Sequence, residues 1–312
     1  MTEYQIEKLN NENVQSLLPL YEKAFGKPIS LVELKSKFNT ENWGLKNVGF
    51  ISFFNEKAVG FYGVFPCEVE IDGEKMLIAQ SGDTMVDAEH RRKKLFVLLA
   101  KKTFKFCEEN GISLVYGFPN QFSFPSFIKK LDWIHIHNIV AHSFKAKCLP
   151  FLTMSRLFKV PESFFNKVQH LILSFKSVQP KSYQSIINSS EDLAIVKDAS
   201  FFEYKTYFKK YFLSINSKLV WVKPTSMYLL VGDVETCSKE EFEEVLGKLK
   251  KLCFILGIPH LRFQCSENSI LNDFVKDSGV KLEAEYPVGC LPLKPDIEFE
   301  KFKFTLADYD TF

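Results

Sequence analysis

One stretch, residues 77–133, constrains the fold of this chain more than any other. It reads as an apolar strand, a basic turn, an amphipathic helix, a second strand and a short helix in direct succession. A helix is predicted because apolar side chains recur at three- and four-residue spacing before Asn110-Gly111, a typical helix end; these positions are Leu95, Leu98, Leu99 and Phe106. Residues 113–118 then read as a buried strand, which Pro119 ends. Two strands joined by one helix over so short a distance predict neighbouring strands with a right-handed crossover.

The turn between the first strand and the helix is strongly basic. His90 is followed directly by Arg91, Arg92, Lys93 and Lys94. Backbone N–H groups at a helix start and cationic side chains in the same place favour the binding of phosphates. The alternative is a solvated helix start, but exposed cations at this end oppose the helix dipole by about 0.3–1 kcal/mol each. A bound anion would remove that cost.

Length and composition predict two domains in a cytoplasmic protein. The chain has 312 residues, of which 46% are hydrophobic and 15% aromatic, and this suffices for extended cores. The formal net charge of +2 gives no sign of attraction to nucleic acid or membrane. Seven cysteines without a Cys-x-x-Cys pair indicate reduced thiols. The start of the chain is polar, and no apolar run approaches the roughly 20 residues of a spanning helix.

The patterns along the chain divide it into three segments. Residues 1–148 carry a first strand, two helices, antiparallel strands at 47–54, 58–65, 68–71 and 75–84, the central stretch, and a last long strand at 134–145. Residues 149–190 are punctuated by prolines and are expected to form a helical connector. Residues 191–312 repeat the series, with strands expected at 217–222, 227–233, 261–265 and 286–293 and helices at 238–256 and 269–277. The loop before the first of these helices, Val234-Glu235-Thr236-Cys237, is acidic and lacks arginine.

On these motifs, residues 4–145 resemble the core of the GNAT superfamily of N-acetyltransferases. The family loop typically reads Arg/Gln-x-x-Gly-x-Gly/Ala, and its amides hold the pyrophosphate of acetyl-coenzyme A. Here Lys94 stands in place of the glycine, and Phe96 in place of the later small residue. Gly117-Phe118-Pro119-Asn120 and Lys130-Leu131-Asp132-Trp133 are similar to the family's later strand and its Lys-Leu-Gly-aromatic ending. The resemblance implies an α/β fold with a mixed sheet, and a second, degenerate domain of this type in residues 191–312.

The resemblance also implies a site for acetyl-coenzyme A. Its phosphates would be held at the basic turn and the helix start, by Arg91, Arg92, Lys93, Lys94 and Leu95. Backbone groups of Met85 and Val86, on the strand before the turn, would pair with the pantetheine arm. Asn120 would either bind a polar group of that arm or cap the short helix that follows it.

The sequence offers fewer candidates for catalytic groups than for cofactor binding. The attacking amine must be neutral, and Asp83 is the candidate base that would relay its proton through water; the alternative is a strand-end aspartate without such a role. Ile128 stands where the family often has a tyrosine acid. No metal site is predicted, because His135, His137 and His142 lack a companion carboxylate or cysteine at ligand spacing. Residues 302–312 are aromatic and acidic, and are expected to pack with their carboxylates near the amine.

We therefore expect an enzyme that moves an acetyl group from acetyl-coenzyme A to the amine of a small molecule, such as an amino sugar. No nucleic acid, membrane or metal is expected as a partner, and the sequence carries no signal of oligomeric state. One alternative is an aminoacyl transferase of the Fem type, which resembles paired domains of this fold and uses aminoacyl-tRNA. Another is a non-catalytic protein that binds coenzyme A or acts in assembly; Ile128 favours this reading, whereas Arg91 and Arg92 oppose it.

Overall fold

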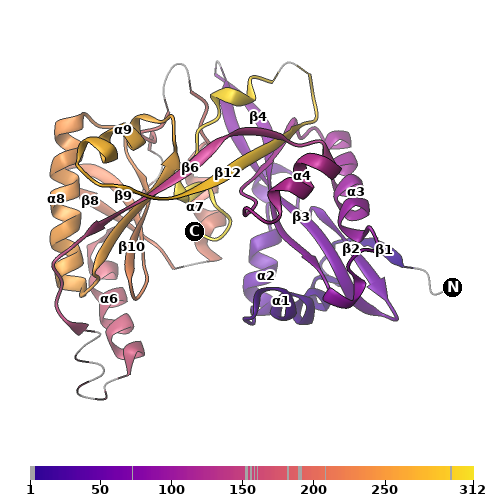
Figure 1. Ribbon diagram of the computed structural model, residues 1–312, viewed down its shortest axis with the longest axis horizontal. Coiled ribbons are helices and arrows are strands. Elements are labelled where there is room, and N and C mark those ends of the chain that lie inside the picture. The colour runs from indigo at the N-terminus through magenta and orange to yellow at the C-terminus, as the bar shows by residue number, and fades with distance from the viewer. Residues whose placement is uncertain are drawn as a thin grey trace. The chain divides into compact units, whose positions relative to one another are not determined.

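The chain forms two compact units, each assembled from separate segments (Figure 1). The computed structural model describes residues 4–71, 73–151, 154, 157, 159, 161–180, 183–188, 192–207, 209–295 and 297–312. Unit 1 comprises Met1–Ile136, Ser200–Tyr207 and Pro287–Glu300, and unit 2 comprises His137–Ala199, Phe208–Tyr286 and Lys301–Phe312. These units differ from the three continuous segments that the sequence suggested. The described part of the expected connector, 149–190, belongs to unit 2 and contains helix α6 (Glu162–Lys176).

Unit 1 is built on a mixed β-sheet. Its strands lie in the order β1 (Gln5–Lys8), β2 (Gly49–Phe54), β3 (Lys57–Ile71), β4 (Glu74–Val86), β5 (Leu114–Gly117) and the end of β12 (Leu282–Pro292). Within this set β4 and β5 are parallel, and the other neighbouring pairs are antiparallel. The strands expected at 58–65 and 68–71 form one long strand, because β3 stays in register with β4 through Pro66, which lies opposite Ala79.

Helices pack on both faces of this sheet. Successive side chains of β3 point to opposite faces of the sheet. Phe61 and Phe65 belong to the cluster beneath α1 (Leu17–Phe25) and α2 (Leu31–Phe38). Tyr62 and Val64 belong to the cluster beneath α3 (Leu95–Glu109) and α4 (Phe124–Leu131). Helix α1 begins at Leu17, after a short turn η1 (Val14–Ser16), so Pro19 lies in its first turn and does not kink it. Short pieces η2 (Glu41–Trp43), η3 (Ala88–His90), α7 (Ala199–Tyr204) and η4 (Lys205–Tyr207) complete the helical structure around the sheet.

Unit 2 is likewise built on parallel and antiparallel strands, with a comparable crossover. Its strands lie in the order β6 (Ile134–Lys145), β11 (His260–Ser266), β10 (Tyr228–Val234), β9 (Lys218–Pro224), β8 (Tyr211–Ile215) and β7 (Ser177–Val178). Again one pair, β10 with β11, is parallel, and α8 (Lys239–Leu256) joins the two; α9 (Ile270–Asp277) follows β11. The helix predicted at 238–256 is confirmed and spans Lys239–Leu256. Ser238 and Glu241 form a capping box, and Gly257 ends the helix in the left-handed conformation. Two short turns follow: η5 (Phe299–Lys301), most of which belongs to unit 1, and η6 (Leu306–Asp308), which belongs to unit 2.

Each unit contains one strand that the sequence had assigned to the other domain. In unit 1, β12 pairs antiparallel with β5, and Gly289 lies opposite Gly117. In unit 2, β6 pairs antiparallel with β11 over residues 139–145. The strand expected to complete the first domain therefore pairs in unit 2, and β12 takes the place beside β5. Glycine is needed at 289 because a Cβ there would lie 2.9 Å from the Trp133 ring.

Candidate functional site

The basic loop of unit 1 has a backbone shaped to hold an anion. Arg91 is extended, Arg92 is left-handed with φ of 64°, and Lys94 is left-handed with φ of 60° as the N-cap of α3. The first hydrogen bond of the helix runs from the Leu98 N–H to the Lys94 carbonyl, at 3.0 Å. The N–H groups of the three preceding residues have no acceptor within the helix and point toward the loop. Such a turn at a helix start forms a nest for phosphate oxygens.

The charges of the loop are not neutralised by the protein itself. Arg91, Arg92, Lys93 and Lys94 are all exposed, and among the residues that the structure describes none of the four makes an ion pair. They stand at the positive end of the α3 dipole, where each exposed cation is unfavourable by about 0.3–1 kcal/mol. An anion bound at this point would interact favourably with the side chains, the helix dipole and the free N–H groups together.

Two apolar residues anchor the start of α3. The Leu95 side chain is buried, so this residue contributes its N–H and not its side chain to the loop. Phe96 is half-buried and contacts the rings of Tyr62 and Phe127, with centroid distances of 6.1 and 5.3 Å. A large residue is tolerated here because its side chain turns into the core.

Beside this loop, β4 separates from β5 and leaves a backbone edge open. The parallel pairs are Ala79 with Val115 and Gln80 with Tyr116, whereas β4 continues to Val86. The Asp87 N–H donates to the Val59 carbonyl at 2.9 Å, so by the alternation of an antiparallel ladder the N–H and C=O of Val86 face away from β3. Val86 thus offers backbone groups on the side that β5 does not cover.

Met85 lies differently from Val86. The same alternation directs its backbone groups to Phe61 on β3, and its side chain is buried in the cluster beneath α1 and α2. We therefore expect Met85 to shape the strand through packing, while Val86 presents its backbone to a ligand.

Asp83 occupies an irregular point of β4. The β3–β4 register shifts between Phe61 and Gly63, and Asp83 is left-handed with φ of 52°, as in a β-bulge. Its carboxylate forms an ion pair with Lys37 of α2, at 2.7 Å, and both side chains are almost fully buried. The Lys37 carbonyl in turn accepts a hydrogen bond from the Tyr204 hydroxyl at 2.9 Å. This arrangement ties α2 to the bulge, and it engages the carboxylate that was considered as a base.

Sequence reasoning missed Lys37 because lysines on a surface helix normally face solvent. A signal was nevertheless present, since Lys37 follows Leu34 by three residues and both are buried on the same face of α2.

A partly buried hydroxyl pair lies next to the open edge. Tyr62 and Ser81 have their hydroxyl oxygens 2.7 Å apart, and Ser81 follows the last β4 residue that pairs with β5. Burial raises the pKa of Tyr62 well above its ordinary value, and the hydrogen bond to Ser81 only partly opposes this. Tyr62 is therefore a neutral hydrogen-bonding group at physiological pH.

Asn120 forms a turn that leads into the short helix α4. Its side-chain oxygen accepts hydrogen bonds from the N–H groups of Phe122 and Ser123, at 3.0 and 2.9 Å. These contacts close a turn before α4, whose N-cap is Ser123 without a side-chain capping hydrogen bond, and the role of Asn120 toward the cofactor arm stays a prediction. Ile128, at the position of the family tyrosine, is half-buried and packs on the α3 cluster.

The histidines considered as metal ligands are held by separate partners. His137 lies 2.7 Å from the Ser266 hydroxyl, and His142 lies 2.9 Å from the Asn272 side chain. His135 packs against Phe124. Within the described ranges, no group of three histidine, cysteine or acidic side chains is placed to hold a metal ion.

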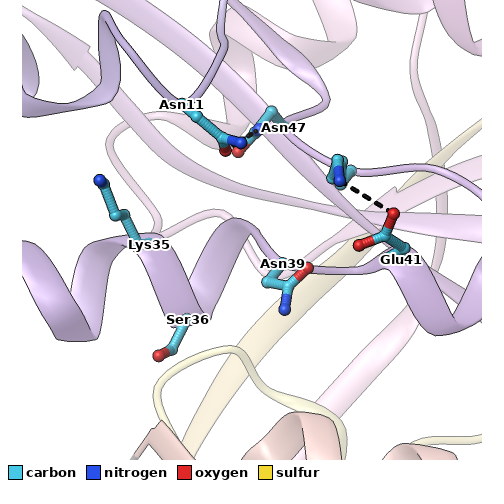
Figure 2. Close-up of a pocket in the computed structure, with 7 residues that line it drawn as sticks. Asn11, Lys35, Ser36, Asn39, Glu41 and Asn47 are labelled. Carbon is cyan, nitrogen blue, oxygen red and sulfur yellow. Dashed lines mark hydrogen bonds and ion pairs between the residues drawn. The ribbon is translucent and has the colours of Figure 1, made fainter.

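A polar hollow of about 410 Å³ lies beside α2 (Figure 2). It is lined by Asn11, Lys35, Ser36, Asn39, Glu41, Lys46 and Asn47. Lys46 and Glu41 form an ion pair at 2.8 Å, and the Asn47 amide donates to the Asn11 side chain at 2.9 Å. The hollow includes no residue of the basic loop or of the open β4 edge, so it is not part of the site described above.

The fold and the loop of unit 1 together define the class of an acyltransferase-type α/β domain. A family model described as an acetyltransferase (GNAT) domain matches residues 5–136. This match lies within unit 1 and covers less than half of the chain. A search of curated proteins finds no match. In the part of the chain that is described, no helix is long and apolar enough to cross a membrane.

Solved structures share the fold at low sequence identity. A GCN5-related N-acetyltransferase from Kribbella flavida is 9% identical with a TM-score of 0.59, covering 92% of this chain and 70% of its own. A GCN5-related N-acetyltransferase from Anabaena variabilis is 10% identical with a TM-score of 0.59, covering 94% and 73%. A conserved Enterococcus faecalis protein described as a probable N-acyltransferase is 12% identical with a TM-score of 0.61, covering 94% and 73%. At these identities the likeness concerns the fold alone.

Proposed function

We propose that the chain is an N-acetyltransferase that uses acetyl-coenzyme A and acetylates the amine of a small molecule, such as an amino sugar. The observation that carries the proposal is the exposed, unpaired cationic loop with two left-handed residues at the start of α3. Arg91, Arg92, Lys93 and Lys94, with the first N–H groups of the helix, would hold the pyrophosphate. The matched acetyltransferase domain model supports this assignment.

In this proposal the open edge of β4 positions the acyl carrier. Val86 would pair with the pantetheine arm through its backbone, and an N–H of the same edge would polarise the thioester carbonyl. The acceptor nitrogen then forms a bond to the carbonyl carbon, the carbon–sulfur bond breaks, and the thiolate takes up a proton. Holding the two reactants in line supplies much of the acceleration in such a reaction.

Asp83 has a positioning role in this scheme. Because its carboxylate is paired with Lys37 at 2.7 Å, we assign to it the fixing of the β4 bulge beside the reacting atoms. The acceptor's proton would then leave through water. A buried pair of this kind fixes the local backbone, because separating the charges would leave each of them without its counter-ion.

Calorimetric titration of acetyl-coenzyme A, coenzyme A and a tRNA pool into the purified protein tests the proposal. We expect coenzyme binding that weakens at least about tenfold in the double variant Arg91→Ala/Arg92→Ala, since a hydrogen bond to a charged group contributes about 1.5–3 kcal/mol. The matched control is Lys129→Ala/Lys130→Ala, which removes the same charge from exposed positions on α4. Unaltered coenzyme affinity in the arginine variant would contradict the proposed phosphate site.

A non-catalytic role is the second candidate, and the engaged state of Asp83 together with Ile128 favours it. It predicts coenzyme binding without turnover over a panel of amines. Binding of tRNA without binding of coenzyme would instead support the Fem-type alternative.

A further inference from the structure

Unit 2 repeats the divergence of parallel strands that unit 1 shows at its β4 edge. The β10–β11 pairs run from Tyr228 with His260 to Val231 with Phe263. Beyond that point β10 continues with β9, through a register shift at Gly232, and β11 continues with β6. The two strands therefore separate at Gly232, and we call the space between their ends the β10–β11 gap.

Residues 301–305 lie along the edge of β11 at this gap. Thr305 forms an antiparallel bridge with Cys265. The Ser266 N–H donates to the Phe304 carbonyl at 2.9 Å, and the Phe304 N–H donates to the Ser266 hydroxyl at 2.8 Å. On the other side, Leu193 exchanges backbone hydrogen bonds with residues 301 and 303, both at 2.8 Å. The segment thus joins by its backbone, as an added strand does.

The side chains of this segment are buried as deeply as core residues. Phe302 and Phe304 are both 0% exposed, and the ring of His137 stacks on Phe304 at 6.1 Å. Burial of two such rings stabilises the position of the segment through the hydrophobic effect.

A charge pair fixes the register of the segment. Asp308 accepts at one oxygen from the Thr305 N–H at 2.7 Å, and its other oxygen lies 2.8 Å from the Lys197 ammonium. Lys197 also lies 3.1 Å from Asp233, next to Gly232 on β10. An acidic residue at position 308 therefore completes a buried cluster that belongs to the β10–β11 gap.

Phe312 fills the position that glycine leaves open on β10. A Cβ added to Gly232 would lie 2.3 Å from the Phe312 ring, so the ring sits directly on the backbone at the point of separation. Phe312 is 1% exposed and meets the Trp221 ring edge to face at 5.5 Å. The Lys223 ammonium donates to the Thr311 carbonyl at 2.7 Å.

We propose that the β10–β11 gap is a peptide-binding site and that residues 302–312 are its ligand, carried in cis. The ligand class is a peptide that is extended over its first four residues and then turns, with aromatic residues two apart, an acidic residue four positions after the second, and a further aromatic residue four positions later. Unlike the basic loop of unit 1, this site is not suited to bind a phosphate. The residues after β10 are Glu235, Thr236 and Cys237, which offer no cation to a phosphate. This inference does not depend on the acetyltransferase activity proposed for unit 1.

A full-length variant with an emptied site tests the proposal. Phe304→Asp/Phe312→Ala leaves every residue of the gap unchanged but removes two buried rings from the segment. We expect a labelled synthetic peptide FKFTLADYDTF to bind this variant with one-to-one stoichiometry, measured by fluorescence anisotropy. The same peptide with lysine at the position of Asp308 should bind at least about thirtyfold more weakly, because it places a cation beside Lys197.

Two proteins serve as controls for this titration. The first is the wild-type chain, whose site is filled. The second is Phe122→Asp/Phe175→Ala, which makes the same changes at residues that are 84% and 83% exposed. Both should bind the peptide at least about tenfold more weakly than the emptied variant.

Amide hydrogen exchange of the wild-type chain gives an independent readout. The Phe304 and Thr305 amides should exchange as slowly as those of β10. A folded emptied variant that does not bind the peptide would overturn the proposal. If that variant does not fold, rapid exchange of both amides in the wild-type chain would overturn it, and slow exchange would support it.

Discussion

Replacing Lys94 by glycine tests the left-handed conformation on which the basic loop depends. Lys94 has φ of 60° and precedes the first residue of α3. A residue with a Cβ in this conformation costs about 1–2 kcal/mol. Glycine removes that cost but loses about 0.5–1 kcal/mol through the greater freedom of the unfolded chain. Removing an unfavourable cation from the helix start adds about 0.3–1 kcal/mol. We therefore expect Lys94→Gly to raise the free energy of unfolding by about 1–2 kcal/mol.

The neighbouring lysine provides the matched control. Lys93 is also exposed and carries the same charge, but it is not among the residues with positive φ. Lys93→Gly removes the same cation from the helix start, so the electrostatic gain of about 0.3–1 kcal/mol is shared by the two variants. Lys93→Gly relieves no left-handed strain. We therefore expect Lys94→Gly to have the higher free energy of unfolding of the two variants, by about 1–2 kcal/mol.

Urea unfolding followed by tryptophan fluorescence measures this difference. The slope with denaturant should be unchanged in both variants, so the midpoints report the stabilities directly. Equal midpoints would refute the reasoning, because they would mean that position 94 does not favour glycine. A parallel titration with coenzyme A should show less than about a tenfold change for Lys94→Gly, since only one of four cations is removed.

Three further predictions concern buried contacts. Asp83→Asn removes the charge partner of buried Lys37 and should lower the free energy of unfolding by about 3–5 kcal/mol in denaturant titrations; a loss below about 1 kcal/mol would contradict the pairing. Burial alone would lower the pKa of Lys197, but two buried carboxylates outweigh it and raise the pKa to about 12. The stability that protonated Lys197 contributes is therefore complete below pH 10.5 and is lost as pH rises through about 12. Lys197→Met should remove that part of the loss of stability at alkaline pH, and an unchanged pH profile of unfolding would contradict this role of Lys197. Gly289→Val should destabilise unit 1 by about 1–3 kcal/mol and alter Trp133 fluorescence, whereas an unaltered emission would argue against β12 beside β5.

Local structure was predictable wherever periodicity and capping residues coincide. The helix over 239–256 lies between a capping box and a left-handed glycine, and its observed bounds are Lys239–Leu256. The crossover from β4 through α3 to β5 was likewise predicted. In contrast, the pattern of residues 134–145 is the same whichever sheet the strand joins, so the exchange of β6 and β12 carries no local signal.

The site was predictable at its loop and less so at its strand. The cationic run stands out in the sequence, and its placement at a helix start follows from the apolar spacing after it. The pairing of Asp83 with Lys37 joins residues that are far apart in the chain, and it depends on a bulge that the sequence does not announce. The strand β8 (Tyr211–Ile215) was also missed, because the predicted strand began only at residue 217.

The exchange of β6 and β12 has a consequence for how this protein is made. Unit 1 lacks the strand beside β5 until Gly289 and its neighbours have left the ribosome, so β5 stays without this partner while residues 137–286 are being made. Contacts between residues so distant in sequence form late, since the loop that they close is long. No single cut in the chain yields either unit whole, because excising unit 1 requires residues 1–136 together with 200–207 and 287–300. Loss of either half would leave the other with an unpaired strand edge, which is the kind of surface that aggregates.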